Sequence, residues 1–196
     1  MIEIVDNFLP ENIAVQFSRN FFKTYNWKPY WNTGVSKTES RSWNWHTSVG
    51  NDLPDMGQLT QDNSPEDMKL LWNATEVKLF ELSGVEHVMN RWYSNSHTYG
   101  QEGPIHRDDG SFTCLYYPCE NWQIDWEGGT AFYNEDITDV IQYAGYKFNR
   151  MVIFSAKIPH RAMPITRDCY RLRTSIVFKT SMDVNSKSYL DWYNKR

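Results

Sequence analysis

Two histidines and an aspartate stand at positions where they could bind one metal ion. His106 and Asp108 are separated by a single residue, so on an extended strand both side chains would project from the same face. His160 lies much further along the chain, after an apolar segment in Met151–Phe154. Two imidazoles and one carboxylate bind one face of Fe(II) and leave other coordination positions open for oxygen and an organic ligand. The pattern therefore indicates a non-haem iron site.

Each part of this set has a simpler interpretation when it is taken alone. His106 and Asp108, beside Asp109, would also suit a turn at the surface, and His160 would suit a surface or capping position. The same three side chains could hold Zn²⁺ in a protein without catalytic activity. The order and the spacing of the three residues favour the iron site.

A basic strand follows the second histidine. In Arg171–Lys179 the side chains of Arg171, Arg173 and Ser175 alternate on one face. An arginine directed into a barrel is costly unless it meets an anion, and its guanidinium matches a carboxylate through two hydrogen bonds. An edge strand with solvated arginines is the alternative. Combined with the metal set, the strand indicates an anchor for a dicarboxylate co-substrate.

The elements that would position these residues divide the chain into two parts. The apolar spacing predicts a short strand at Ile2–Val5, a helix over residues 11–25, and a second helix that Ser64 caps and Gly84 ends. From Val85 onward, short segments rich in β-branched and aromatic residues alternate with turns, which is typical of an antiparallel sandwich or barrel. The expected strands are 88–93, 103–107, 111–117, 129–133, 151–154 and 171–179.

In this order, the motifs resemble those of the prolyl-hydroxylase-type Fe(II)/2-oxoglutarate-dependent dioxygenases. The matching pieces are Tyr99-Gly100, His106-Arg107-Asp108, Thr113 to Tyr117, Gly128 to Phe132, Phe148 to Phe154, His160 and the arginine strand. The initial Ile4 to Pro10 and the helix after it are similar to the start of that family's domain. The resemblance implies a mostly β fold with flanking helices (α+β), in which a double-stranded β-helix, or jelly roll, packs on N-terminal helices.

The resemblance also implies a role for individual residues. His106, Asp108 and His160 match the ligands of Fe(II). Arg173 matches the residue that binds the distal carboxylate of 2-oxoglutarate, with Arg171 as the alternative because it lies nearer the usual separation from His160. The residues expected to line or contact the co-substrate are Tyr117, Tyr99, Thr113 and Leu115. No catalytic residue is expected beyond the metal ligands. O₂ is the second co-substrate, and ascorbate is a further candidate cofactor.

The implied reaction is hydroxylation of an unactivated C–H bond, with release of succinate and CO₂. Asp108 favours hydroxylation over halogenation, because related halogenases lack the carboxylate ligand. The first substrate hypothesis is a prolyl residue of a peptide or protein, followed by another amino-acid residue or a free amino acid. Two aromatic segments, Trp27–His46 and Cys119–Gly128, could form walls of the substrate cleft, although ordinary packing is the favoured interpretation of both.

Composition sets further bounds. The chain has 196 residues and a net charge of −4, so we expect one domain, with a helical support region over about 1–84 and a jelly-roll core over about 85–180. The acidic balance speaks against a nucleic-acid partner. Three cysteines in no zinc-binding spacing, no signal-peptide pattern and no long apolar stretch predict a cytoplasmic protein that does not enter a membrane. The competing classes are a non-catalytic metal-binding jelly roll, with a structural or sensor role, and an assembly protein that lost activity.

Overall fold

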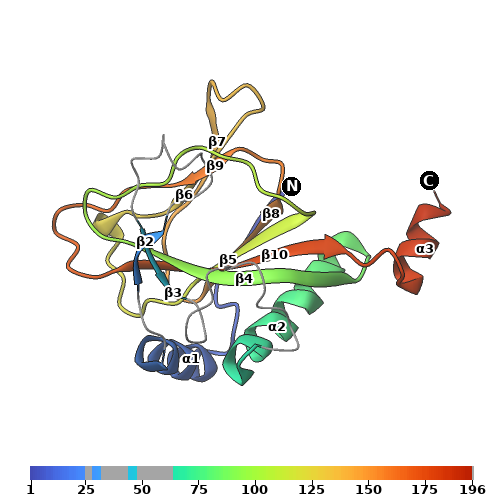
Figure 1. Cartoon of the computed structure of the whole chain (residues 1–196), viewed down its shortest axis with the longest axis horizontal. Coiled ribbons are helices and arrows are strands. Elements are labelled where there is room, and N and C mark those ends of the chain that lie inside the picture. The colour runs from blue at the N-terminus through green and yellow to red at the C-terminus, as the bar shows by residue number, and fades with distance from the viewer. Residues whose placement is uncertain (25–27, 32–43, 48–63, 196) are drawn as a thin grey trace.

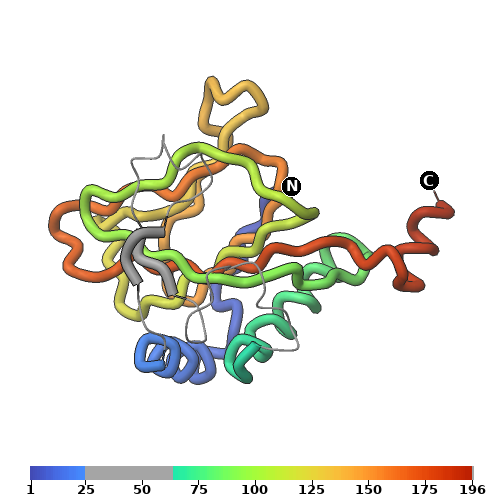
Figure 2. Tube along the Cα trace, viewed as in Figure 1, coloured from blue at the N-terminus to red at the C-terminus, as the bar shows by residue number. Residues whose placement is uncertain are grey.

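The computed structural model describes residues 1–24, 28–31, 44–47 and 64–195. Two antiparallel sheets face each other in this part of the chain (Figures 1 and 2). The larger is seven-stranded, in the order β1 (Ile2–Val5), β8 (Arg150–Ser155), β5 (Phe112–Tyr117), β10 (Arg173–Met182), β4 (His87–His97), β3 (Asn44–Thr47) and β2 (Lys28–Trp31). The smaller has the order β7 (Val140–Ala144), β6 (Thr130–Tyr133) and β9 (His160–Ala162).

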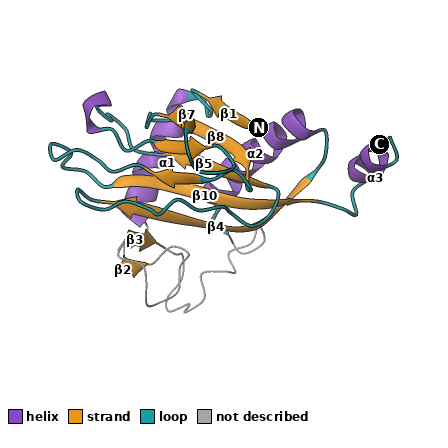
Figure 3. Ribbon diagram, turned by 90° about the horizontal axis from the view of Figure 1, so that it is seen from above, coloured by secondary structure: helices purple, strands orange, loops and turns teal. Residues whose placement is uncertain are grey.

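Two long helices cover the outer face of the larger sheet. Helices α1 (Glu11–Thr24) and α2 (Glu66–Ser83) lie side by side against this face, on the opposite side from β6, β7 and β9 (Figures 1 and 3). A single 3₁₀ turn, η1 (Ile124–Trp126), precedes β6, and a third helix, α3 (Lys187–Tyr193), follows the end of β10. The long helices therefore support the sheet from outside and leave its inner face to the second sheet.

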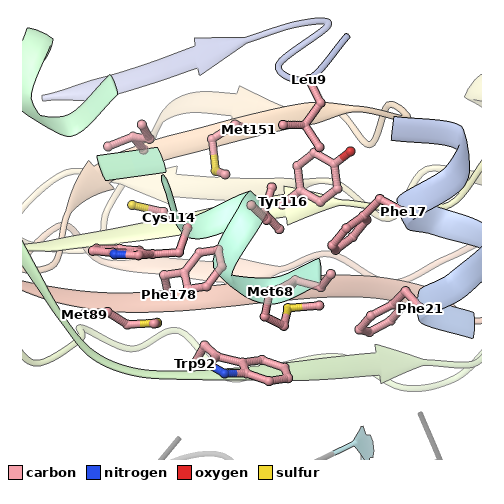
Figure 4. Close-up of a cluster of buried hydrophobic side chains, with 14 of the residues drawn as sticks. Leu9, Phe17, Phe21, Met68, Met89, Trp92, Cys114, Tyr116, Met151 and Phe178 are labelled. Atoms are coloured by element: carbon pink, nitrogen blue, oxygen red, sulfur yellow. The ribbon is translucent and has the colours of Figure 1, made fainter. Parts of the chain in front are cut away.

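The hydrophobic core is divided by the larger sheet into two layers. Between the sheet and the helices, Phe17 packs edge-on against Tyr116 with ring centroids 5.6 Å apart (Figure 4). Trp72 packs against Phe178 at a tilt, also with ring centroids 5.6 Å apart. The second layer lies between the two sheets and contains Leu115, Tyr117, Phe132, Phe154 and Val177. Because side chains alternate across a strand, β10 contributes to both layers. Ile176 and Phe178 face the helices, whereas Val177 faces the smaller sheet.

This alternation places four residues of β10 between the sheets. Arg173, Ser175, Val177 and Lys179 are separated by two positions each, and all four are buried. The strand pairs with β4 on one side and β5 on the other, so it lies in the middle of the larger sheet. A charged side chain on this face of a central strand has no route to solvent past the strand edge, and it must find partners inside the sandwich.

The second helix begins differently from the expectation and ends as expected. Pro65 is the N-cap residue and makes no side-chain cap. Ser64 precedes the N-cap residue, and its hydroxyl accepts a hydrogen bond from Trp92 Nε1 at 2.7 Å. Gly84 takes a left-handed conformation (φ 71°) and its N–H donates to the carbonyl of Phe80, which closes the last turn.

The predicted fold class is confirmed, with local corrections. The first helix begins at residue 11, and strands occur within 2–5, 111–117, 129–133 and 171–179, as expected. The segment 103–107 is not a regular strand and makes only an isolated bridge at His106. Strand β4 runs to His97 and not to Tyr93, because pairing with β10 holds its polar half in the sheet. Strands β7 and β9 were not predicted, since one is largely exposed and the other has three residues.

Candidate metal and co-substrate site

A pair of backbone hydrogen bonds brings the two histidines together. The N–H of His106 donates to the carbonyl of His160, and the N–H of His160 donates back to that of His106, both at 3.0 Å. The two residues thus form a narrow antiparallel bridge between the segment before β5 and the start of β9. Their rings lie on the same side with centroids 4.4 Å apart. The fold therefore places side by side two histidines that are far apart in the sequence.

Asp108 completes the cluster. Its carboxylate lies 3.4 Å from His106 Nε2 and 3.3 Å from His160 Nε2. One ligand atom from each of the three residues lies within 4.8 Å of the other two, which is close enough for all three to bind one metal ion. The side chains of Asp108 and His160 are 7 % and 6 % exposed, whereas that of His106 is 33 % exposed. The cluster is consequently open to solvent on the His106 side.

The outer nitrogens of both imidazoles determine which nitrogen can bind a metal. Nδ1 of His106 lies 3.0 Å from the carbonyl of Pro104, and Nδ1 of His160 lies 2.9 Å from that of Ile158. A carbonyl only accepts, so both Nδ1 atoms carry the proton and donate it. In a neutral ring Nε2 then keeps its lone pair, and both Nε2 atoms point at Asp108. This backbone support of the outer nitrogen is common among metal-binding histidines.

Electrostatics keep the cluster in the state that binds metal. Burial raises the pKa of Asp108, but the contacts of its carboxylate with the imidazoles of His106 and His160 and the charge of Lys179 outweigh burial and hold the pKa far below its usual range. Burial lowers the pKa of His160, and Asp108 offsets only part of that effect. The carboxylate is therefore ionised and His160 is neutral near pH 7, as a metal ligand must be.

Arg173 is the second feature of the site. Its side chain is 1 % exposed, and its Nε donates to the carbonyl of Gly128 at 2.6 Å. The guanidinium carbon lies 5.6 Å and 5.8 Å from the ring centroids of Tyr117 and Tyr146. Within the part of the chain that the structure describes, no carboxylate forms an ion pair with it. A buried cation without an acidic partner is costly and suits an anionic ligand.

One pocket between the sheets joins Arg173 to the metal cluster. Its lining comes from both sheets: Tyr93, Asn95, His97, Gly103, His106, Asp108, Thr113, Leu115, Thr130, His160, Ala162, Arg173, Ser175, Val177 and Lys179. Two buried atoms of this lining, Asn95 Oδ1 and His97 Nδ1, have no hydrogen-bond partner among the described residues. Burial and the charge of Arg173 lower the pKa of His97 to about 3, so this ring is neutral at pH 7. The pocket thus offers free polar atoms as well as a cation.

The predicted co-substrate residues separate into two groups. Thr113 and Leu115 line the pocket as expected. Tyr117 is buried behind it, with its ring beside Arg173 and its hydroxyl 2.8 Å from that of Thr130. Tyr99 is not part of this lining: it lies in the turn after β4 and is 58 % exposed.

Arg171, the alternative anchor, lies outside this pocket. Strand β10 begins at Arg173, so the alternation that put both arginines on one face does not extend back to Arg171. Arg171 Nη1 donates to the carbonyl of Glu120 at 2.7 Å, outside the pocket. Of the two arginines, only Arg173 lies where a ligand of the metal cluster could contact it.

The aromatic segments proposed as cleft walls contribute packing where they are described. Trp122 lies 4.1 Å from Tyr146 and meets Trp126 edge-on at 5.2 Å, and neither tryptophan lines the pocket. Of Trp27–His46, only the backbone of residues 28–31 and 44–46 is described, so its side chains lie outside the described residues.

Sequence reasoning missed the polar residues on the other walls of the pocket. Lys179 lies on the same face of β10 as Arg173, and Tyr93, Asn95 and His97 line the pocket from β4. The alternation that places Arg173 and Ser175 on one face continues through Val177 to Lys179, so it would have found this lysine. No comparable pattern marks the β4 residues, because the polar end of that strand is not recognisable as a strand.

Comparison with solved structures identifies the fold. No family model and no curated protein matches the sequence. A prolyl hydroxylase from Trichoplax adhaerens, solved with a hypoxia inducible factor peptide, is similar at a TM-score of 0.65 with 18 % identity, over 96 % of this chain and 86 % of that one. The viral collagen prolyl hydroxylase of Paramecium Bursaria Chlorella virus-1, solved with 2OG, matches at a TM-score of 0.55 with 12 % identity, over 91 % and 94 %.

The chain has the fold of the 2-oxoglutarate/Fe(II) oxygenases. This oxygenase fold is not limited to hydroxylases. The non-heme alpha ketoglutarate dependent epimerase SnoN matches at a TM-score of 0.63 with 9 % identity, over 92 % of this chain and 77 % of that one. Because one fold supports several reactions, the reaction has to be inferred from the site. Among the described helices, none has the length and apolar character needed to span a membrane.

Proposed function

We propose that this chain is a single-domain Fe(II)- and 2-oxoglutarate-dependent oxygenase that hydroxylates an unactivated C–H bond. His106, Asp108 and His160 are the proposed ligands of Fe(II), and Arg173 is the proposed anchor of the distal carboxylate of 2-oxoglutarate. The observation that carries the proposal is the position of Arg173, a buried guanidinium without a described acidic partner that lines the same pocket as the three ligands.

The donor atoms in the pocket fit both groups. Two imidazole Nε2 atoms and one ionised carboxylate are the donor set that non-haem Fe(II) takes, and they leave further coordination positions free. A dicarboxylate between the cluster and Arg173 would supply the missing anion and could accept hydrogen bonds from the guanidinium, whose Nη atoms have only long contacts of 3.3 Å and 3.4 Å with Ser175, Gly129 and Thr130. A zinc site without catalytic activity would have no use for this buried cation.

The residues of the chain would contribute binding and positioning. Bound Fe(II) and 2-oxoglutarate would activate O₂, which is the oxidant: one oxygen atom would enter succinate as 2-oxoglutarate loses CO₂, and the other would become the new hydroxyl group of the substrate. The backbone carbonyls of Pro104 and Ile158 fix both imidazoles, and Arg173 fixes one end of the co-substrate. Leu115 and Val177 make the wall between these points apolar and limit the access of water.

The substrate is proposed from the structural neighbours and the residue pattern. The Trichoplax enzyme was solved with a peptide and belongs, by its description, to the prolyl hydroxylases. A prolyl residue of a peptide or protein is therefore the first candidate, and another amino-acid residue or a free amino acid is the second. The exposed side of the metal cluster at His106, 33 % exposed, is the face from which such a substrate would approach.

Succinate formation tests the proposal. The purified chain, supplied with Fe(II), ascorbate and 2-oxoglutarate, is expected to form succinate slowly without substrate and faster with the right peptide or amino acid. His106→Ala should abolish this turnover, because it leaves only two of the three proposed protein ligands of Fe(II). Turnover that His106→Ala leaves unchanged, or none in the wild type with any candidate substrate, would refute the assignment.

A further inference from the structure

Lys179 is a second buried cation in the pocket, on the same strand as Arg173. Its side chain is 2 % exposed, and its ammonium forms an ion pair with Asp108 Oδ2. The nitrogen also lies 3.3 Å from Thr113 Oγ1 and 5.9 Å from the ring centroid of Tyr93. The proposed reaction assigns no role to this lysine, although its position beside a metal ligand is fixed by a central strand of the sheet.

The two oxygens of Asp108 have different surroundings. Oδ2 accepts a hydrogen bond from the hydroxyl of Thr113 at 2.6 Å, contacts the Lys179 ammonium and lies 3.3 Å from His160 Nε2. Oδ1 has a described contact only with His106 Nε2, at 3.4 Å. That nitrogen carries no proton when the neutral ring donates through Nδ1. Of the two oxygens, Oδ1 therefore keeps the lone pairs that a metal ion can use, while Oδ2 is occupied by two donors.

We propose that Lys179 is a positioning residue, which holds Oδ2 of Asp108 so that the carboxylate binds the metal through Oδ1 alone. This inference rests on the proposed metal site and deepens it. Binding through one oxygen leaves a coordination position that two-oxygen binding would occupy. The lysine thus keeps the metal open to its other ligands.

The charge of Lys179 has a second consequence. Without metal, the ammonium neutralises the carboxylate of Asp108, which is 7 % exposed. With metal bound to Asp108, the positive charge of the ammonium repels that of the divalent cation. Lys179 should therefore stabilise the metal-free protein and weaken metal binding. Loss of the lysine should strengthen metal binding while it reduces turnover, a combination that general damage to the fold would not produce.

The test is a metal titration of Lys179→Met, which keeps the length of the side chain and removes the charge. With Mn²⁺ alone, we expect the dissociation constant to fall at least tenfold, and the metal-free protein to unfold at a lower temperature that Mn²⁺ restores. With Fe(II) and 2-oxoglutarate, succinate formation should fall at least tenfold. With Co²⁺, the visible absorption spectrum should change, because the coordination of the metal changes.

Two variants separate position from charge. Lys179→Arg keeps a cationic donor, and its affinity for Mn²⁺ should stay within threefold of the wild type. Lys157→Met is the matched control for charge, because Lys157 is exposed and donates to the backbone carbonyl of Asp108 at 3.2 Å, not to its carboxylate. Its affinity for Mn²⁺ should stay within twofold. If Lys179→Met does not fold, Lys179→Gln replaces it in the same titration.

The outcomes distinguish this inference from the proposed function. Weaker or unchanged Mn²⁺ binding in Lys179→Met and Lys179→Gln, in a wild type that binds Mn²⁺, would overturn the positioning role. A wild type that binds Mn²⁺ but forms no succinate would refute the oxygenase assignment and leave the metal titration valid. An unchanged Co²⁺ spectrum in both variants would also contradict the inference.

Discussion

Replacing Arg173 by methionine should weaken the binding of 2-oxoglutarate far more than it affects folding. Arg173 is 1 % exposed, lines the metal pocket and has no described acidic partner. A carboxylate held by a guanidinium through two charge-assisted hydrogen bonds gains about 3 kcal/mol, at roughly 1.5 kcal/mol for each bond. That energy corresponds to roughly a 100-fold increase in the dissociation constant. Lysine at this position keeps the charge but loses the fork, so we expect about a tenfold increase for Arg173→Lys.

Calorimetric titration of the Mn²⁺-loaded protein with 2-oxoglutarate measures this effect without turnover. Arg171→Met is the matched control, because it removes the same charge only two residues along the chain. The side chain of Arg171 donates to the carbonyl of Glu120. Its dissociation constant should stay within twofold of the wild type. An equal loss of affinity in both variants, or no loss in Arg173→Met, would refute the anchor.

Three further changes test how the fold supports the site. Gly128 has φ 76°, and a Cβ there would lie 3.0 Å from Cγ of Arg173. Gly128→Ala should therefore lower the melting temperature and also weaken 2-oxoglutarate binding, measured by thermal melting and by calorimetric titration. Burial lowers the pKa of His87 to about 4 from 6.5, so the unfolded chain takes up the proton first and stability falls as pH drops from 6.5 to 4. Because of this histidine, the free energy of unfolding should be about 2 kcal/mol lower at pH 5 than at pH 8, and His87→Gln should remove that difference. The hydrogen bond from Arg150 is the main cause that lowers the pKa of Asp6 to about 2. The stabilisation from this ion pair is present above pH 3.8 and is lost as the pH falls toward 2. Asp6→Asn should lower the free energy of unfolding by about 1 kcal/mol or less at pH 7, because the pair is partly solvated.

The metal cluster was predictable because its residue types are rare and chemically specific. His106, Asp108 and His160 could be selected without knowing how the chain brings them together. The reason given was incomplete, since the segment 103–107 is not a regular strand. The backbone bridge between His106 and His160 aligns the two imidazoles, and such a pairing between distant segments leaves no local signal in the sequence.

The co-substrate residues were harder to predict because they depend on where a strand begins. Arg171 and Arg173 look equivalent in an alternating pattern, and only the start of β10 at Arg173 separates them. Tyr99 was placed by resemblance, but a turn exposes it. Lys179 was overlooked since a lysine near the end of a strand is usually solvated; here the neighbouring strands β4 and β5 enclose it.

The most direct test of the account is the visible absorption of the protein with Fe(II) and 2-oxoglutarate in the absence of oxygen. A metal-to-ligand charge-transfer band is expected to grow with 2-oxoglutarate and to saturate at one equivalent per chain. The band should be absent in His106→Ala and should require a much higher 2-oxoglutarate concentration in Arg173→Met. A wild-type protein that binds Fe(II) and 2-oxoglutarate but gives no such band would contradict the claim that the two share one site.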